Sequence, residues 1–341
     1  MKYRVRRQTG LTLVELMIAT TLSLVLLAGV LLVFSANKTT YQMQNGLGTL
    51  QENGRYALRQ ITADLKMAGF GGCLSPRMGP RILVVAKNGP SYLDDFADGE
   101  FFIGVNGTAT TYGAKTSVAN TDSIEIRGPL RSSVSFVTDE TLTTGSVEVV
   151  GANTGFAVDD HLMISDCAGA EIFHATALVS PNTDGHTDIS HSSTDNDQAD
   201  LSRLYTADAV VTKLNRHIYF IADTTRVNAN GQAILALYRF DGTNTEELVD
   251  GVENMQIEYG LDSNSDESID AFTESPAAAD WANVKAVRVS LLLNSVDAAS
   301  AVEPDYTYFP VQSTSIDQSG TDDFRLRQEF TAVVSVRNSV L

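Results

Sequence analysis

The sequence predicts an α+β protein in which a long N-terminal helix packs on a large β-rich C-terminal domain. Three observations predict this fold. Residues 11–34 are apolar except for one charge, residues 35–68 have helical periodicity, and residues 69–341 alternate short β-branched and aromatic runs with clusters of Gly, Asn, Asp and Thr. We therefore expect a leader (residues 1–10), an apolar helix, its amphipathic continuation and an extracytoplasmic domain.

The leader is basic and the rest of the chain is acidic. Residues 1–10 contain four basic residues and no acid, whereas the whole chain has a formal charge of −18. Without the leader, 20 of the 24 basic residues remain against 42 acidic ones. This balance disfavours a nucleic-acid partner, because the phosphate backbone would be repelled. It also predicts a cytoplasmic N-terminus, since positive charge stays on the inner side of a membrane.

The apolar segment is long enough to cross a bilayer. A helix over residues 11–34 spans roughly 36 Å. A conventional signal peptide would end in small residues, and residues 33–37 (VFSAN) fit that pattern poorly. A plain membrane anchor does not explain Glu15, because a carboxylate in a spanning helix costs about 2.5–3.5 kcal/mol.

The junction between leader and helix carries a specific motif. Residues 10–15 (GLTLVE) resemble the class III signal of type IV pilins and type II secretion pseudopilins. The resemblance implies that a prepilin peptidase cuts between Gly10 and Leu11 and methylates the new amine of Leu11. Glu15 then becomes the fifth residue of the mature chain. Leu11 departs from the family pattern, in which phenylalanine is commonest.

Glu15 has a physical role in this reading. Cleavage leaves a cationic amine at Leu11 inside the membrane, and Glu15 of a neighbouring subunit can neutralise it. Two buried charges that are each costly alone become tolerable as a pair. We expect this pairing to fix the axial offset between subunits; the alternative is a protonated Glu15 that is merely tolerated.

The helix is expected to continue to about Ala68 and to stop at the following glycines. Its apolar face is formed by residues at steps of three and four: Leu47, Leu50, Gly54, Ala57, Ile61, Leu65 and Ala68. We assign these charged residues to its other faces: Glu52, Arg55, Arg59, Asp64 and Lys66. A coiled-coil stalk is the alternative, which glycines 46, 48 and 54 weaken.

The C-terminal domain contains strand-like runs separated by turn residues. The predicted strands are residues 81–86, 122–127, 161–165, 172–179, 209–221, 233–240, 254–261, 284–294 and 326–338. Residues 180–200 form a polar, acidic segment without a core pattern. We interpret this segment as a loop, either a mobile insertion or a contact surface.

Several separate segments of the domain resemble one particular group of these proteins, the PilW family of minor pilins. They are residues 67–73 (MAGFGGC), 164–167 (ISDC), 251–260 (GVENMQIEYG), 284–291 (VKAVRVSL) and 330–338 (FTAVVSVRN). The resemblance implies a type IV pilin-like fold and no enzymatic activity. It also implies a minor subunit that helps to prime pilus assembly near the tip, and so supports piliation, twitching motility and adhesion.

The resemblance also implies binding partners and cellular locations. The partners would be the prepilin peptidase, other minor pilins, the major pilin, a tip adhesin and the inner-membrane assembly platform. Before assembly the subunit would be a single-pass inner-membrane protein with a periplasmic domain, and afterwards it would lie in an extracellular fimbrium. The alternative is the J-type minor pseudopilin of type II secretion, which is usually shorter.

Two cysteines, Cys73 and Cys167, are present. An even number in an exported chain predicts one disulfide between them. The alternative is two buried thiols.

One acidic segment has metal-ligand spacing. The candidate calcium ligands alternate along residues 262–270: Asp262, Asn264, Asp266, Ser268 and Asp270. Glu267 stands where a calcium loop has its turn glycine, and Thr273 stands where it has a glutamate, so an acidic hairpin loop is the alternative. The histidines lack the spacing of zinc ligands, no common catalytic motif is present, and no other cofactor is expected.

Overall fold

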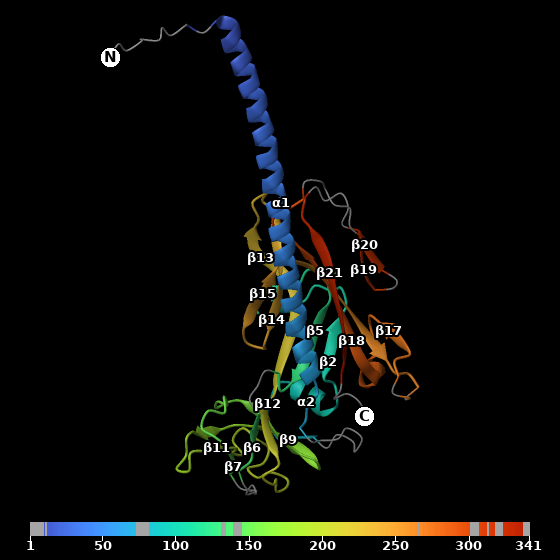
Figure 1. Ribbon diagram of the computed structural model, residues 1–341. Coiled ribbons are helices and arrows are strands. Elements are labelled where there is room, and N and C mark those ends of the chain that lie inside the picture. The colour runs from blue at the N-terminus through green and yellow to red at the C-terminus, as the bar shows by residue number, and fades with distance from the viewer. Residues whose placement is uncertain are drawn as a thin grey trace, which may run out of the picture.

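The computed structural model describes residues 10, 12–72, 82–130, 134–138, 145–264, 266, 268–300, 307–311, 314–317 and 323–336. It contains a long helix, α1 (Leu13–Met67), followed by a β-rich domain. The predicted fold class is confirmed. Figure 1 shows the first half of α1 projecting from the domain and its second half lying along it.

The described elements that follow α1 are mostly strands of very different length. In chain order they are β1 (Ile82–Val84), α2 (Tyr92–Ala97), β2 (Phe102–Val105), β3 (Thr111–Tyr112), β4 (Lys115–Thr116), β5 (Ser123–Gly128), β6 (Val134–Phe136), β7 (Ser146–Val149), β8 (His161–Asp166), β9 (Gly169–His174), β10 (Ala177–Val179), β11 (Thr187–Ser190), β12 (Val210–Lys213), β13 (Asn215–Val227), β14 (Ala233–Phe240), β15 (Thr245–Asp250), β16 (Val252–Leu261), β17 (Ala271–Thr273), the 3₁₀ helix η2 (Ala278–Asn283), β18 (Val284–Asn294), β19 (Thr307–Val311), β20 (Thr314–Asp317) and β21 (Arg327–Ser335).

Two sheets cover the second half of α1, and we call them, with that half, the platform. Their strand orders are β17-β16-β18-β21 and β15-β14-β13-β5-β2. Strand β18 is central, paired antiparallel with β16 on one side and with β21 on the other. It is therefore buried along nearly its whole length, and only Lys285 and Arg288 are partly exposed within it.

The predicted apolar face of α1 is buried on the platform from Leu50 onward, whereas its first predicted member, Leu47, is 37% exposed. Leu50, Ala57, Ile61 and Leu65 are at most 1% exposed. A side chain at Gly54 would overlap the ring of Phe330 on β21, so only glycine allows the helix to approach this closely. The helix ends where Gly69 takes a φ of 68°, a left-handed conformation that glycine adopts without strain.

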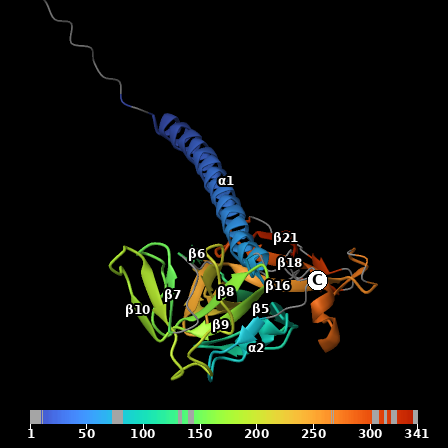
Figure 2. The ribbon, with the colours of Figure 1, turned by 90° about the horizontal axis from the view of Figure 1, so that it is seen from below.

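A second unit, the distal lobe, lies at the end of the molecule farthest from the N-terminus (Figure 1). It consists of the sheets β1-β9-β8-β12-β6 and β10-β11-β7. Its core is separate from that of the platform and includes Val147, Leu162, Phe173 and Tyr205. In Figure 2, β7 and β10 lie on one side of the molecule and β18 and β21 on the other.

The prediction that residues 180–200 form a loop without a core pattern is wrong. Strand β11 lies within this segment and pairs with both β10 and β7. Ile189 is fully buried, and Asn196 forms an isolated bridge with Ala86. Single apolar residues among polar ones suffice here, because a short strand with one buried face needs only every second side chain in the core.

Candidate functional site

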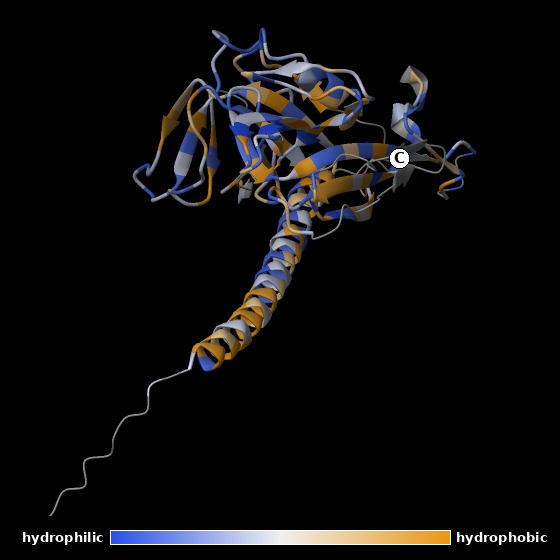
Figure 3. Ribbon diagram, turned by 90° about the horizontal axis from the view of Figure 1, so that it is seen from above, coloured by the Kyte–Doolittle hydropathy of each residue, from blue (hydrophilic) through white to orange (hydrophobic). Residues whose placement is uncertain are grey.

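The apolar half of α1 has no protein partner in the structure. Its large apolar side chains between Leu13 and Phe34 are at least 54% exposed. Among the described residues, α1 is the helix that is long and apolar enough to cross a membrane. Figure 3 shows this half as a nearly uniform hydrophobic rod that becomes mixed where it meets the domain. A lipid bilayer or neighbouring helices could cover such a surface.

Glu15 takes part in capping the N-terminus of α1. Thr12 is the N-cap residue, and its N–H and Oγ1 both donate to Glu15 Oε2 at 2.9 Å. The Glu15 N–H donates to Thr12 Oγ1 at 3.3 Å in return. This reciprocal pair is a capping box, which satisfies backbone donors that the first helical turn leaves free. Within a single subunit the carboxylate therefore already has a local partner.

Gly10, on the leader side of the predicted cleavage point, has open space around it. Gly10 is exposed, and nothing lies within 4 Å of where a side chain would begin. Leu11 lies outside the described residues. Cleavage between Gly10 and Leu11 and methylation of Leu11 stay predictions.

The cysteine prediction receives partial support. Cys167, in the turn between β8 and β9, is disulfide-bonded, whereas Cys73 lies outside the described residues. Gly72 lies against the side chain of Ser165, so the chain reaches the neighbourhood of Cys167 one residue before Cys73. The pairing of the two cysteines stays a prediction.

The candidate calcium loop is the connection between β16 and β17. Its carboxylates accept hydrogen bonds from the loop itself: the Asp266 N–H donates to Asp262, and the Ser263 N–H donates to Asp270. Asn264 Nδ2 contacts Asp266 and Asp270, and Ser268 donates its N–H to Asp266. In the described part of the chain, no group of three or more His, Cys, Asp or Glu side chains could hold a metal ion. Calcium binding stays a prediction to which the geometry adds no support.

A buried polar cluster between α1 and β13 was not predicted from the sequence. Asp64 is 1% exposed, and its Oδ2 lies 2.6 Å from His217 Nδ1 and 2.5 Å from the Tyr219 hydroxyl of β13. Our assignment of Asp64 to a polar face was wrong. The signal was present in the spacing, because Asp64 lies three residues after Ile61 and four before Ala68, on the apolar face.

This cluster fixes the end of α1 against β13. An isolated carboxylate in this position would be costly, and two hydrogen-bond partners make it tolerable. Since Asp64 and His217 are 153 residues apart in sequence, the contact joins α1 to a distant part of the chain. It holds the helix in one register on the domain.

Two family profiles match the chain. One, PilW, described as type IV pilus-assembly protein W, matches residues 218–338. The other, described as the prokaryotic N-terminal methylation motif, matches residues 5–31. Comparison with curated proteins and comparison with solved structures each returned no match.

Proposed function

The chain belongs to the PilW family of type IV pilus-assembly proteins, and we propose that it is a minor pilin that primes pilus assembly and remains near the tip. The family consists of assembly proteins, not enzymes. The observation that carries the proposal is a capped carboxylate, Glu15, at the start of an exposed apolar helix.

The methylation motif and the apolar helix fit a membrane-anchored prepilin destined for a pilus. In our proposal the prepilin peptidase removes residues 1–10 while the domain lies in the periplasm. The inner-membrane assembly platform then brings the subunit together with other minor pilins, the major pilin and a tip adhesin. The finished subunit is extracellular and supports twitching motility and adhesion.

Glu15 registers each entering subunit. Leu11 and Glu15 are four residues apart, which is about 6 Å along a helix. An entering subunit that lies about 6 Å closer to the membrane therefore brings its Glu15 level with the amine of the subunit above. The carboxylate then exchanges its hydrogen bonds with Thr12 for a charged partner, and both buried charges are neutralised.

The presence of Glu15 also indicates where the subunit lies in the priming complex. A subunit at the very top has no amine above it and gains nothing from this carboxylate. We therefore place the chain in the body of the priming complex, below at least one other subunit.

The test is Glu15→Ala at native expression. We expect the number of surface pili to fall at least tenfold, because an unpaired amine in the membrane costs about 2.5–3.5 kcal/mol. Insertion, cleavage and folding should be unchanged, with mass spectrometry finding methylated Leu11 as the first residue. Glu52→Ala, an exposed change on the same helix, is the matched control.

Normal piliation and twitching in the Glu15→Ala strain would refute the registering role. Normal piliation after loss of the whole gene would refute the priming role. Loss of protein secretion in that deletion strain would indicate the type II pseudopilus instead.

A further inference from the structure

Two histidines face each other in the distal lobe, close to its joint with the platform. His161, at the start of β8, and His174, at the end of β9, are directly opposite in the antiparallel register. Their ring centroids are 5.1 Å apart, and the rings meet edge to face. Side chains at directly opposite positions lie on the same face of a sheet, so the two rings form a pair.

The joint between the lobe and the platform includes an apolar cluster around α2. This cluster contains Leu93 and Phe96 of α2, Met163 of β8 and Ile172 of β9. It also contains Leu214, the residue between strand β12 of the lobe and strand β13 of the platform. Helix α2 packs on β1 of the lobe and on β5 of the platform. The cluster therefore helps to hold the two units together.

His161 lies at the edge of this cluster. The Leu214 N–H donates to the His161 carbonyl at 2.9 Å. A Cβ added to Gly89 would lie 2.8 Å from Leu93 Cδ1 and 3.5 Å from His161 Nε2, so the imidazole reaches the segment that leads into α2. A change in the charge of His161 would therefore act directly on the joint.

Both rings fit this environment better when they are neutral. His174 Nε2 lies 3.8 Å from Asp159 Oδ1, whereas His174 Nδ1 is buried and has no hydrogen-bond partner among the described residues. A charged imidazole carries a proton on both nitrogens, so the proton on Nδ1 would lack an acceptor. Charging His161 as well would place two positive charges side by side.

The other charged groups nearby do not remove this cost. Asp160, just before β8, is engaged by Lys213 of β12, with Nζ and Oδ1 2.5 Å apart. Asp159 is 83% exposed, so water weakens its effect. On the side of α2, Arg216 of β13 lies over the ring of Tyr92 and adds positive charge.

The pKa of His161 shifts in the direction that this geometry requires. Burial lowers the pKa most, and a charged His174 lowers it further, whereas Asp160 and Asp159 raise it and Lys213 lowers it. The folded state therefore binds this proton less tightly than the unfolded state does. The stabilisation by the neutral ring is complete above about pH 6.5 and is lost as pH falls below that value.

We propose that the His161–His174 pair makes the joint between the lobe and the platform sensitive to acid. At neutral pH the two neutral rings pack against each other, and the lobe stays attached to the platform. In mild acid both rings take up protons, and the charge beside the joint loosens the lobe while α1 stays bound to the platform. This inference goes beyond the proposed function and does not depend on Glu15.

Hydrogen exchange of the full-length protein in detergent, at pH 7.5 and pH 5, tests the proposal. After correction for the pH dependence of chemical exchange, we expect β8, β9 and α2 to exchange at least about fourfold faster at pH 5. Two unit charges about 5 Å apart change an equilibrium constant by roughly this factor even at the dielectric constant of water. Strands β16 and β18 of the platform should keep their protection.

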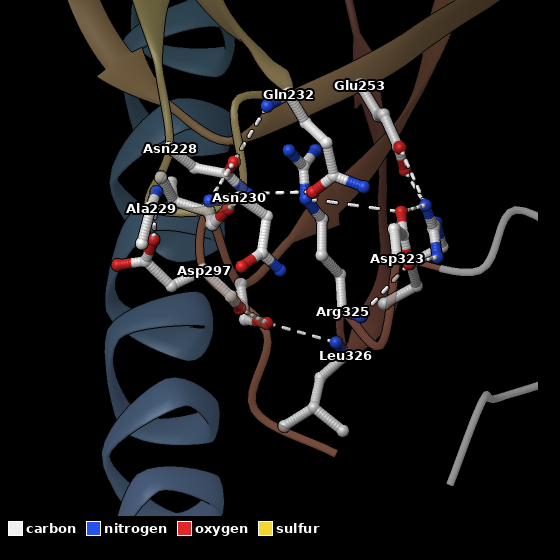
Figure 4. Close-up of polar contacts among 12 residues, drawn as sticks. Asn228, Ala229, Asn230, Gln232, Glu253, Asp297, Asp323, Arg325 and Leu326 are labelled. Carbon is white, nitrogen blue, oxygen red and sulfur yellow. Dashed lines mark hydrogen bonds and ion pairs between the residues drawn. The ribbon is translucent and has the colours of Figure 1, made fainter. Parts of the chain in front are cut away.

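The turn between β13 and β14 supplies a second reference, because the residues labelled around it in Figure 4 include no histidine. Asn228 Nδ2, in this turn, donates to the Val296 carbonyl at 2.9 Å. The Ala229 N–H donates to Asp297 Oδ1 at 3.2 Å. We expect the protection of this turn to be the same at both pH values.

His161→Gln tests the pair itself. Glutamine takes up no proton in this pH range but keeps a hydrogen-bond donor and an acceptor. The variant should therefore lose the acid response, so that exchange in the lobe at pH 5 stays close to that at pH 7.5. His174→Gln should behave in the same way. His186→Gln, in the turn before β11 of the same lobe, is the matched control and should respond as the unchanged protein does.

Equal protection of the lobe at both pH values in the unchanged protein would overturn the proposal. An undiminished acid response in His161→Gln and His174→Gln would overturn it too. If His161→Gln already loosens the lobe at pH 7.5, His174→Gln decides, because either substitution removes the pair. An equal loss of protection in β16 and β18 would show general unfolding in acid and not a change at the joint. None of these outcomes alters the test of Glu15.

Discussion

A buried carboxylate of the platform and a buried carboxylate of the distal lobe are each held by residues from another segment, but over different sequence distances. In the platform, Asp64 contacts His217, 153 residues away. In the lobe, Glu171 is 1% exposed and accepts hydrogen bonds from Ser202 and from Tyr205, the latter 34 residues away. The buried carboxylate of the lobe is thus held by residues much closer in sequence than those that hold the buried carboxylate of the platform.

The family matches divide along the same line. Residues 218–338 and 5–31 belong to the platform, the apolar helix and the leader, and the lobe lies outside both.

The largest expected effect concerns the link between the two regions. A Cys73–Cys167 disulfide would join the end of α1 to the lobe and close a loop of about 94 residues, worth roughly 4–5 kcal/mol before strain. Replacing both cysteines by serine should lower the unfolding midpoint and separate lobe unfolding from platform unfolding in calorimetry. Two alkylatable thiols in native protein would show that the link does not exist.

The next effect is confined to the platform. Asp64→Ala leaves the partners in β13 unsatisfied and should cost about 3 kcal/mol. Hydrogen exchange should become faster in the last turns of α1 and in β13, while β8 and β9 keep their protection. Glu52→Ala, exposed on the same helix, should change stability little, and equal loss of protection in the lobe would contradict the division into two regions.

The pH dependence of the free energy of unfolding should also differ between the platform and the lobe. Burial raises the pKa of Asp122 to about 6, although the N–H groups of Ile257 and Gly107 lower it by hydrogen bonding. The folded state therefore holds this proton more tightly than the unfolded state does. The stabilisation by this bound proton is complete below about pH 4 and is lost as pH rises through 6, which lowers the free energy of unfolding by about 3 kcal/mol.

Urea unfolding of full-length protein in detergent at pH 4.5 and pH 7 measures this contribution. Asp122→Asn should flatten the decline in platform stability over that interval. Asp184→Asn, an exposed change in the lobe, should leave the decline as it is. An unchanged slope in Asp122→Asn would assign the decline to other groups.

The smallest effect compares two glycines of α1. Gly54→Ala should cost about 1–2 kcal/mol, because the new methyl group overlaps Phe330. Gly48→Ala meets nothing within 4 Å and should add up to about 1 kcal/mol through helix propensity. Thermal unfolding of both variants measures the difference, and a stabilising Gly54→Ala would mean that β21 can move away from the helix.

The platform could largely be predicted from the sequence. Strands β14 and β18 occupy the predicted residues 233–240 and 284–294. The predicted helix from 11 to 68 corresponds to α1 (Leu13–Met67). Long, strongly patterned segments such as these are the easiest to assign without knowledge of their neighbours.

The lobe could be predicted less well. The predicted strand 172–179 is two strands, because the chain turns after β9, where the Ala175 N–H donates to Asp160. The predicted strand 209–221 divides at Leu214 between two sheets. In both cases the side chains stay apolar through the break, and only tertiary hydrogen bonds reveal it.

The residues of the candidate site also differ in how far they could be predicted from the sequence. The motif at residues 10–15 could be recognised from local sequence, but the capping by Glu15 required the conformation of Thr12. Asp64 was missed because a charged residue is normally assigned to a solvent-facing side of a helix. Its partners on β13 are too distant in sequence to be inferred from spacing.

The attachment of α1 along only its second half has a mechanical consequence. A pull on the end of this helix reaches the domain through contacts with β18, β21 and β15 and through Asp64. These contacts are distributed along the helix and would be loaded together in shear, not opened one after another. The lobe lies beyond the end of that attachment (Figure 1).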